Sequence, residues 1–113
     1  MAPPYCPDRG DIVWISFSPQ SGHEQAGERP AIALSPERYN KKVGLALFCP
    51  ITSQSKGYPF EVRLPAGMPV SGVVLSDQVR SLDWRSRGAR YICESPDACV
   101  AEIMENITAL LDR

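Results

Sequence analysis

Several features that commonly reveal a function are absent from this chain of 113 residues. It has one histidine, and its four cysteines, at positions 6, 49, 93 and 99, form no CxxC pair, so a Cys/His zinc site is not expected. No glycine-rich phosphate loop of the GxxxxGK type is present, which argues against nucleotide hydrolysis. No long apolar segment and no signal peptide are evident, and scattered thiols fit a reducing compartment. We therefore expect a cytoplasmic protein with no metal, no other cofactor and no membrane contact.

The charge balance is also close to neutral, with a formal net charge of −1. Proteins that grip nucleic acid through a broad basic face usually have a far more basic composition. Locally, however, basic and aromatic side chains gather in one segment, at Arg80, Trp84, Arg85, Arg87, Arg90 and Tyr91. A divided surface of this kind could hold a short RNA at one site while acidic residues elsewhere limit non-specific binding. The alternative for the same arginines is a solvated strand edge.

The apolar pattern predicts a mainly β core with one C-terminal helix, in a single domain over residues 1–113. Strands separated by Gly, Pro and Ser are expected at residues 12–17, 31–34, 45–49, 60–64, 72–75, 78–82 and 89–93. A short helical turn through about residue 41 should follow Ser35 as N-cap and Pro36 as first helical residue. Residues 1–8 read as a loose lead-in, and the polar stretch 18–28 as a mobile active-site loop.

The C-terminal helix, expected over residues 95–112, has the clearest signals. Ser95 is its predicted N-cap, Pro96 its first residue, and Asp97 lies where the helix dipole favours a negative charge. Apolar residues at three-and-four spacing form one stripe: Val100, Ile103, Met104, Ile107, Leu110 and Leu111. We interpret this stripe as a core or dimer contact and not as a cofactor site.

The stretch EQAGERP at residues 24–30 places Arg29 between a glycine-containing loop and an apolar run. Pro30 suits the start of a strand, so Arg29 is expected at a loop-to-strand junction, where a charged side chain stands on a rigid support. That position suits anion chemistry. The alternative is a surface arginine in an ion pair with Glu24 or Glu28.

A second stretch, CPITSQSKGYPF at residues 49–60, combines hydroxyls, an amide and a lysine. These groups can bond to phosphate oxygens, while the rings of Tyr58 and Phe60 offer faces on which unpaired bases stack. The mixture suits single-stranded RNA. The alternative is an ordinary polar loop that leads into a strand, with both rings in the core.

Taken together, the chain resembles the MazF/PemK family of toxin endoribonucleases along nearly its whole length. The blocks that carry the resemblance follow in order: GDIVW at residues 10–14, EQAG at 24–27, RPA at 29–31, LSP at 34–36, YN at 39–40, TSQSKGYPFEV at 52–62 and SDQVRSLDWR at 76–85. The sequence departs from the commonest pattern at Ser16 and Ser18, where relatives often carry Asp, so base choice here can differ.

The resemblance implies an SH3-like small barrel of the MazF/PemK/CcdB type, a homodimer, and metal-independent cleavage of single-stranded RNA (mRNA) at a short motif. The ribose 2′-hydroxyl would attack the neighbouring phosphorus, leaving 2′,3′-cyclic phosphate and 5′-hydroxyl ends. Arg29 and Thr52 match the family's catalytic pair and would stabilise the phosphorane. Glu24 is the candidate base or orienting group, with His23, or no base at all, as alternatives.

The resemblance further implies RNA binding by the polar and basic residues of the matched blocks: Gln25, Asn40, Ser53, Gln54, Lys56, Gln78, Arg80, Arg85 and Arg87. The implied regulator is an antitoxin of the MazE kind, in a type II toxin–antitoxin system that controls growth, with no direct contact to DNA. One alternative is a CcdB-type toxin that binds a topoisomerase and has no nuclease activity. Another is an inert binding module. The presence of both Arg29 and Thr52 favours the nuclease.

Overall fold

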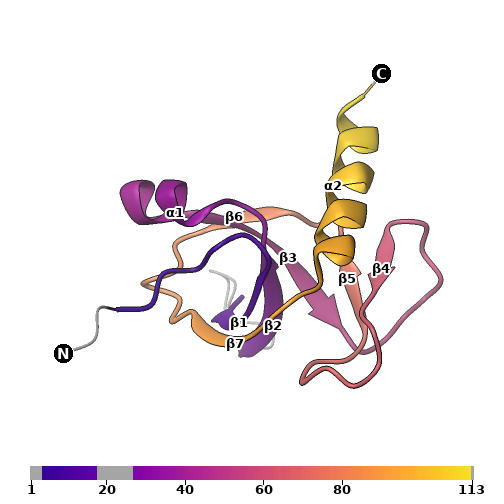
Figure 1. Cartoon of the computed structure of the whole chain (residues 1–113), viewed down its shortest axis with the longest axis horizontal. Helices are drawn as coiled ribbons and strands as arrows, with labels where there is room; N and C mark the ends of the chain where they lie inside the picture. Colours follow the sequence, from indigo (N-terminus) through magenta and orange to yellow (C-terminus); the bar gives the residue numbers. More distant parts are fainter. Residues whose placement is uncertain (1–3, 18–26, 113) are drawn as a thin grey trace.

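The computed structural model describes residues 4–17 and 27–112, which form seven strands and two helices (Figure 1). In chain order these are β1 (Asp11–Ser16), β2 (Glu28–Ala33), α1 (Glu37–Val43), β3 (Ala46–Thr52), β4 (Glu61–Arg63), β5 (Val73–Leu75), β6 (Arg80–Leu82), β7 (Arg90–Glu94) and α2 (Asp97–Leu111). The predicted mainly β fold, with a helix after the second strand and another at the C-terminus, is confirmed. Within these residues, neither helix has the length and apolar character needed to cross a membrane.

The strands pair in the order β4-β5-β3-β2-β1-β7, and every pairing is antiparallel. β3 organises the sheet, because one edge pairs with β2 while the other edge pairs with β6 near its start and with β5 near its end. Among the described residues no pairing joins the outer strands β4 and β7. Closure into a barrel therefore stays a prediction.

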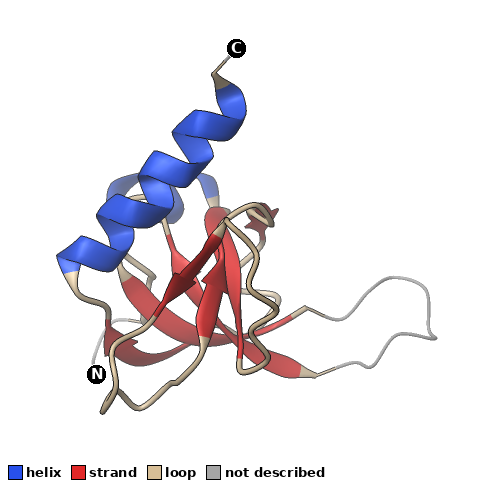
Figure 2. Ribbon diagram, turned by 90° about the vertical axis from the view of Figure 1, so that its right-hand side faces the viewer, coloured by secondary structure: helices blue, strands red, loops and turns tan. Residues whose placement is uncertain are grey.

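Two apolar clusters lie on the two faces of this curled sheet. β1 and β2 contribute to both, since Ile12 and Ile32 enter one cluster and Val13 and Ala31 the other. α2 lies across one face of the strands (Figure 2) and buries Cys99 and Ile103 in the first cluster. The second cluster is built around other large buried side chains, Phe48, Leu82 and Trp84. Alternating strand residues thus fill both sides of the sheet.

The start of α2 differs from the expectation by one residue. Pro96, and not Ser95, is the N-cap, and the helix begins at Asp97. Both the backbone N–H and the hydroxyl of Ser95 donate to the carbonyl of Gly10, at 2.9 and 2.8 Å. The hydroxyl therefore ties the start of the helix to the residue before β1, and it makes no capping hydrogen bond.

The predicted apolar stripe of α2 is buried at its N-terminal half. Ile103 is fully buried, whereas Met104, Leu110 and Leu111 are 37%, 47% and 79% exposed. The core interpretation holds for the first turns of the helix. For the exposed C-terminal part, a dimer contact stays a prediction.

The N-terminal segment is not the loose lead-in that the prolines suggested, as far as residues 4–8 are concerned. Pro7 is buried, and the Tyr5 hydroxyl donates to the Asp11 carboxylate at 2.6 Å. The Asp8 carboxylate accepts the N–H of Glu37 at 2.8 Å. A carboxylate from outside the helix thus serves the first turn of α1, where the dipole favours negative charge.

The expected N-cap of α1 is also displaced by one residue, because the helix begins at Glu37 with Pro36 as N-cap. The Ser35 hydroxyl donates to the side-chain oxygen of Asn40 at 2.6 Å and accepts the N–H of Leu47 at 2.9 Å. At the other end, Gly44 takes up φ 85°, and its N–H bonds to the Asn40 carbonyl. This left-handed position suits glycine.

Candidate active site

Two adjoining clefts open where the partner of β3 changes from β6 to β5. The first has a volume of about 420 Å³ and is lined by Phe17, Arg29, Pro50, Ile51, Thr52, Gln54, Lys56, Tyr58, Glu61, Leu75, Gln78 and Arg80. The second, of about 550 Å³, is lined by Gly27, Glu28, Arg29, Pro30, Ile51, Thr52, Ser53, Gln54 and Ser71. Arg29 and Thr52 line both clefts, so a ligand bound in either would meet a guanidinium and a hydroxyl.

Arg29 is placed on a strand and not at the junction that the sequence suggested. β2 begins at Glu28, so Arg29 is its second residue and pairs with Ile15 of β1. The first two residues of β2 are exposed, while its last three are buried. The strand thus holds the arginine on a rigid support at the edge of the core, as the anion-site interpretation requires.

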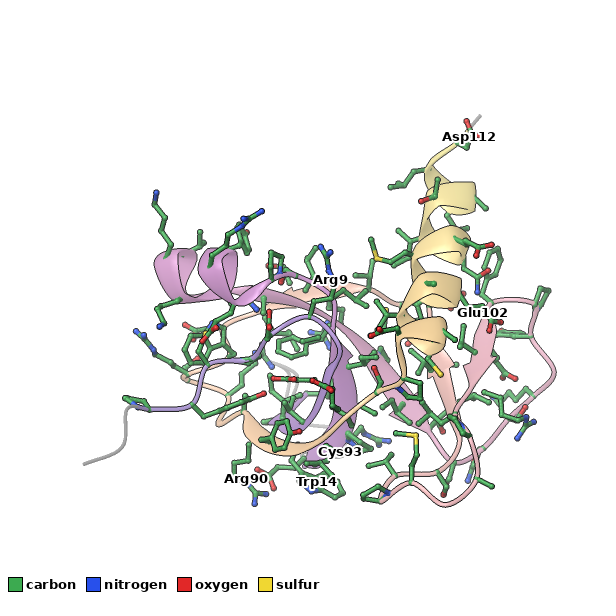
Figure 3. All side chains as sticks on the ribbon, viewed as in Figure 1. Arg9, Trp14, Arg90, Cys93, Glu102 and Asp112 are labelled. Carbon is green, nitrogen blue, oxygen red and sulfur yellow. The ribbon has the colours of Figure 1, made fainter. Side chains whose placement is uncertain are left out.

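Of the two glutamates considered as ion-pair partners of Arg29, the structure describes Glu28. Glu28 forms an ion pair with Arg90 of β7. The Nε–H of Arg90 also donates to the Glu28 carboxylate, at 3.3 Å. Arg90 lies next to Trp14 (Figure 3), its partner in the register of β7 and β1. Glu28 is therefore engaged by Arg90. Glu24, the other candidate, lies outside the described residues.

Thr52 ends β3 and is half-buried. Its side-chain oxygen accepts the N–H of Gln54 at 3.1 Å, which tightens the turn that leaves the strand. On the opposite side Thr52 pairs with Val73 of β5. The hydroxyl hydrogen is not used in that bond to Gln54 and can be donated to a ligand oxygen.

The loop after Thr52 forms the rim of the first cleft. Residues 53–59 are all exposed, and Tyr58 is 53% exposed. Tyr58 lines the cleft, which fits a stacking surface, whereas Phe60 is half-buried and does not line either cleft. The two rings that looked equivalent in the sequence therefore have different surroundings.

Phe17 and Arg80 also line the first cleft and contact each other. The Arg80 guanidinium carbon lies 5.5 Å from the centre of the Phe17 ring, a cation–π distance. Sequence reasoning assigned Phe17 to the first strand and gave it no role. No local signal could have found it, because it reaches the cleft through the curl of the sheet.

Six of the predicted site residues meet in the first cleft: Arg29, Thr52, Gln54, Lys56, Gln78 and Arg80. Ser53 lines the second cleft. The predicted residues Glu24 and Gln25, and the alternative base His23, lie outside the described residues. The structure thus brings together most of the described set, drawn from β2, β3, β6 and two loops.

Two predicted arginines lie outside both clefts. Arg85 stacks on the Trp84 ring, with its guanidinium carbon 4.8 Å from the ring centre. Arg87 donates to the carbonyl of Ser16 at 3.1 Å, which joins the segment before β7 to the end of β1. Contact of these two with RNA stays a prediction.

The prediction that Asn40 binds RNA is wrong, because this residue of α1 is fully buried and is not a surface group. Its side-chain N–H₂ donates to the carbonyls of Pro7 and Ser35, at 2.8 and 2.9 Å, and its oxygen accepts the Ser35 hydroxyl. The ring N–H of Trp84 donates to the backbone carbonyl of Asn40 at 3.0 Å. α1 also lies at the opposite end of the molecule from β4 and β5 (Figure 1). The amide holds the fold together.

The described residues contain no cluster of three His, Cys, Asp or Glu side chains that could hold a metal ion. Cys49 and Cys99 are buried, and the other two cysteines are half-buried. Burial, with a smaller contribution from Asp77, raises the pKa of the Cys49 thiol to about 12. A neutral, enclosed thiol is a poor nucleophile.

These features define a class: a small antiparallel β protein whose open cleft is lined by guanidinium, ammonium, hydroxyl and amide groups, the groups that can bind an anion. The chain belongs to the family of PemK-like and MazF-like toxins of type II toxin–antitoxin systems, whose model matches residues 8–111. The endoribonuclease toxin MazF of Escherichia coli K12 is 58% identical over 85 residues, which cover 75% of this chain and 76% of that protein. The endoribonuclease toxin ChpB of the same strain is 38% identical over 111 residues, 93% and 94% of the two chains.

Solved structures agree with this assignment. A MazE–MazF crystal structure from Deinococcus radiodurans contains a chain that is 56% identical, with a TM-score of 0.91 over 96% of this chain and 97% of that one. A crystal structure of MazF from the same organism is also 56% identical, with a TM-score of 0.88 over 96% and 98%. The family predicted from the sequence is confirmed.

Proposed function

We propose that this chain is a toxin that cuts single-stranded RNA at a short sequence motif, without a metal ion. Its relatives MazF and ChpB are named endoribonucleases, and this chain is an endoribonuclease of the same family. The observation that carries the proposal is the shared position of Arg29 and Thr52 in both clefts.

The proposed reaction uses the RNA's own nucleophile. The ribose 2′-oxygen loses its proton and forms a bond to the adjacent phosphorus, while the bond from phosphorus to the 5′-oxygen breaks. The leaving 5′-oxygen takes up a proton. The products are a 2′,3′-cyclic phosphate and a 5′-hydroxyl, so no group from the protein is transferred.

The protein would supply charge stabilisation and positioning. Arg29 is permanently cationic, so its guanidinium can neutralise the charge that builds on the phosphorane oxygens. Thr52 can donate its hydroxyl to a non-bridging oxygen. A donor at such a position contributes about 10²- to 10³-fold to kcat in enzymes that stabilise an oxyanion. The group that removes the 2′-proton stays open, with Glu24 and His23 as candidates.

Recognition of bases would fall to the amides and cations around the catalytic pair. Gln54 and Gln78 line the first cleft and can read base edges, since an amide offers both donors and an acceptor. Tyr58 offers a ring on which an unpaired base can stack. Ser53, which lines the second cleft, and Arg85 and Arg87 are proposed further contacts. Gln25, outside the described residues, is proposed as another.

The proposed partners are a MazE-like antitoxin and a second copy of the chain. Support for the antitoxin comes from the similar MazF chain, which was solved with MazE. An acidic antitoxin segment would satisfy the same cations that RNA phosphates use. Cytoplasmic location and control of growth are part of the same proposal.

The CcdB-type alternative, a toxin that binds a topoisomerase, is less well supported. A protein that acts by binding alone has no need for a guanidinium and a hydroxyl in one cleft. Two relatives that are 58% identical over 85 residues are also named endoribonucleases.

The test incubates wild type, Arg29→Ala and Thr52→Ala with a long single-stranded RNA in EDTA and maps the ends by sequencing. Arg63→Ala is the matched control, since Arg63 is exposed on β4 and lines neither cleft. We expect discrete cuts with cyclic-phosphate ends from wild type and Arg63→Ala, and a loss of at least about 100-fold in both site variants. Equal cutting by all four proteins would contradict the proposed site.

A further inference from the structure

The carboxylate of Glu61, the first residue of β4, gathers three hydrogen bonds from three consecutive residues. One oxygen accepts the Ser55 hydroxyl at 2.7 Å and the Gly57 N–H at 3.2 Å. The other accepts the Lys56 N–H at 2.9 Å. In the sequence, Glu61 is marked only by its place in a matched block. Its partners, however, all belong to the rim of the first cleft.

The two backbone N–H groups form a small concave site for an anion. Gly57 has φ +78°, a left-handed conformation, and this lets successive N–H groups point toward one charge. Such a nest usually binds a phosphate or another free anion. Here the protein's own carboxylate fills it, and these donors hold the pKa of Glu61 below its ordinary value, with the Lys56 N–H as the largest cause.

Little else restrains this part of the chain. Residues 53–59 are exposed, so side-chain burial does not fix the loop. The Glu61 N–H also donates to the Tyr58 carbonyl at 3.2 Å, which closes the turn on its other side. Glu61 thus bonds to the loop in two ways: its carboxylate accepts the N–H groups of Lys56 and Gly57, and its own N–H donates to Tyr58.

We propose that Glu61 is a positioning residue, whose carboxylate fixes the backbone of residues 55–57 and thereby directs the Lys56 and Tyr58 side chains into the RNA cleft. This inference rests on the proposed function, because it assigns Glu61 a part in binding the same RNA. Glu61 does not act on the reacting phosphate. It acts through the loop.

The sign of the expected effect separates this role from a simple charge effect. Glu61 itself lines the first cleft, so an unengaged carboxylate there would repel RNA phosphates. If its charge were all that mattered, Glu61→Gln would bind RNA more tightly. If it positions the loop, the same change weakens binding, because a glutamine presents one acceptor oxygen to three donors.

The experiment measures Kd for a non-cleavable 2′-deoxy oligonucleotide, together with KM and kcat for the matching RNA. For Glu61→Gln we expect Kd and KM to rise about tenfold, with kcat within about threefold of wild type. Amide exchange at Lys56 and Gly57, read by mass spectrometry or NMR, should quicken in the same variant. Glu105→Gln, the same change at an exposed residue of α2, is the control and should match wild type in every measurement.

Lys56→Ala tests whether the effect passes through the loop. In wild type this change should raise Kd, whereas in the Glu61→Gln background it should add little, since the lysine is then no longer directed into the cleft. Ser55→Ala, which removes one donor and leaves the carboxylate in place, should give a smaller rise in Kd. It keeps the inference testable if Glu61→Gln fails to fold.

A Kd for Glu61→Gln equal to or below that of wild type would overturn the inference, as would full additivity with Lys56→Ala. If wild type cleaves RNA but Glu61→Gln behaves as Glu105→Gln does, the positioning role fails alone. If wild type cleaves no RNA at all, it is the proposed function that fails.

Discussion

Gly72 lies so close to Thr52 that a Cβ at Gly72 would stand 2.1 Å from the Thr52 carbonyl oxygen. The φ of Gly72, +119°, is also one that other residues rarely adopt. The segment that enters β5 therefore packs directly against the backbone of Thr52, a proposed catalytic residue. This close approach is the reason for glycine at position 72.

Gly72→Ala should impair catalysis by displacing Thr52. The added methyl group meets backbone atoms, which cannot swing aside as a side chain can. A displacement of about 1 Å at a catalytic group can cost up to about 10²-fold, so we expect kcat to fall by tenfold or more. Single-turnover kinetics on RNA would measure the rate of the cleavage step in the variant and in wild type.

Gly67→Ala is the control for backbone strain. Gly67 has φ +88°, yet no atom lies within 4 Å of the position its Cβ would take. It should lose stability through strain, by about 1 kcal/mol, while kcat stays near that of wild type. If both variants lost kcat equally, contact with Thr52 would not be the cause.

Asn40→Ala should destabilise the fold and leave RNA specificity unchanged. Removing the amide leaves the buried carbonyls of Pro7 and Ser35 without their donor. We expect a loss of about 2 to 4 kcal/mol in the free energy of unfolding, measured by urea denaturation. Gln78→Ala should do the opposite, with little change in stability and altered cleavage sites. A relaxed motif in Asn40→Ala at full stability would contradict the structural role.

Arg80→Ala should reduce the salt dependence of RNA binding. A contact between Arg80 and one phosphate releases about one counterion from the strand, so the slope of log Kd against log salt should fall by about 0.7. Loss of the Phe17 contact should weaken binding further. Arg63→Ala should keep the wild-type slope. An unchanged slope in Arg80→Ala would show that Arg80 does not contact an RNA phosphate.

The buried Cys49 thiol should destabilise the protein in alkali. Its folded pKa, about 12, lies above the ordinary value of 9.0. Above pH 9 the unfolded chain releases this proton while the folded chain keeps it, so stability is full below that pH and falls as pH rises toward 12. At about pH 10.5 the loss relative to neutral pH should be about 2 kcal/mol.

Urea denaturation of wild type and Cys49→Ala at both pH values isolates this contribution. The alanine variant starts from lower stability but should lose less of it on going to high pH. Parallel losses in the two proteins would show that Cys49 ionises alike in the folded and unfolded states.

The sequence predicted the elements of this fold well because apolar alternation and turn residues mark them locally. Errors cluster where a polar side chain found a distant partner. Serine is a common N-cap residue, yet the hydroxyls of Ser35 and Ser95 donate to Asn40 and Gly10. Helix propensity rules consider neighbours in the chain and cannot see such partners.

The candidate site shows the same limit. Arg29 and Thr52 stood out by their motifs, and the structure places them together. Phe17 and Gly72 have no local signature, because each acquires its position from the pairing of strands. Asn40 lay in a matched block and was therefore assigned to RNA binding, but it is needed by the core. A shared motif marks residues of a family without saying which of them face the ligand.

The most direct test of the central claim replaces one ribose. Once the cut site is mapped, a short RNA is made with a single 2′-deoxy nucleotide on the 5′ side of the scissile phosphate, and a second with the deoxy position one nucleotide further along. Attack by the 2′-hydroxyl predicts that wild type leaves the first RNA intact and cuts the second, with cyclic-phosphate ends. Cleavage of the first RNA at the mapped site would contradict the account, because its nucleophile would have to come from elsewhere.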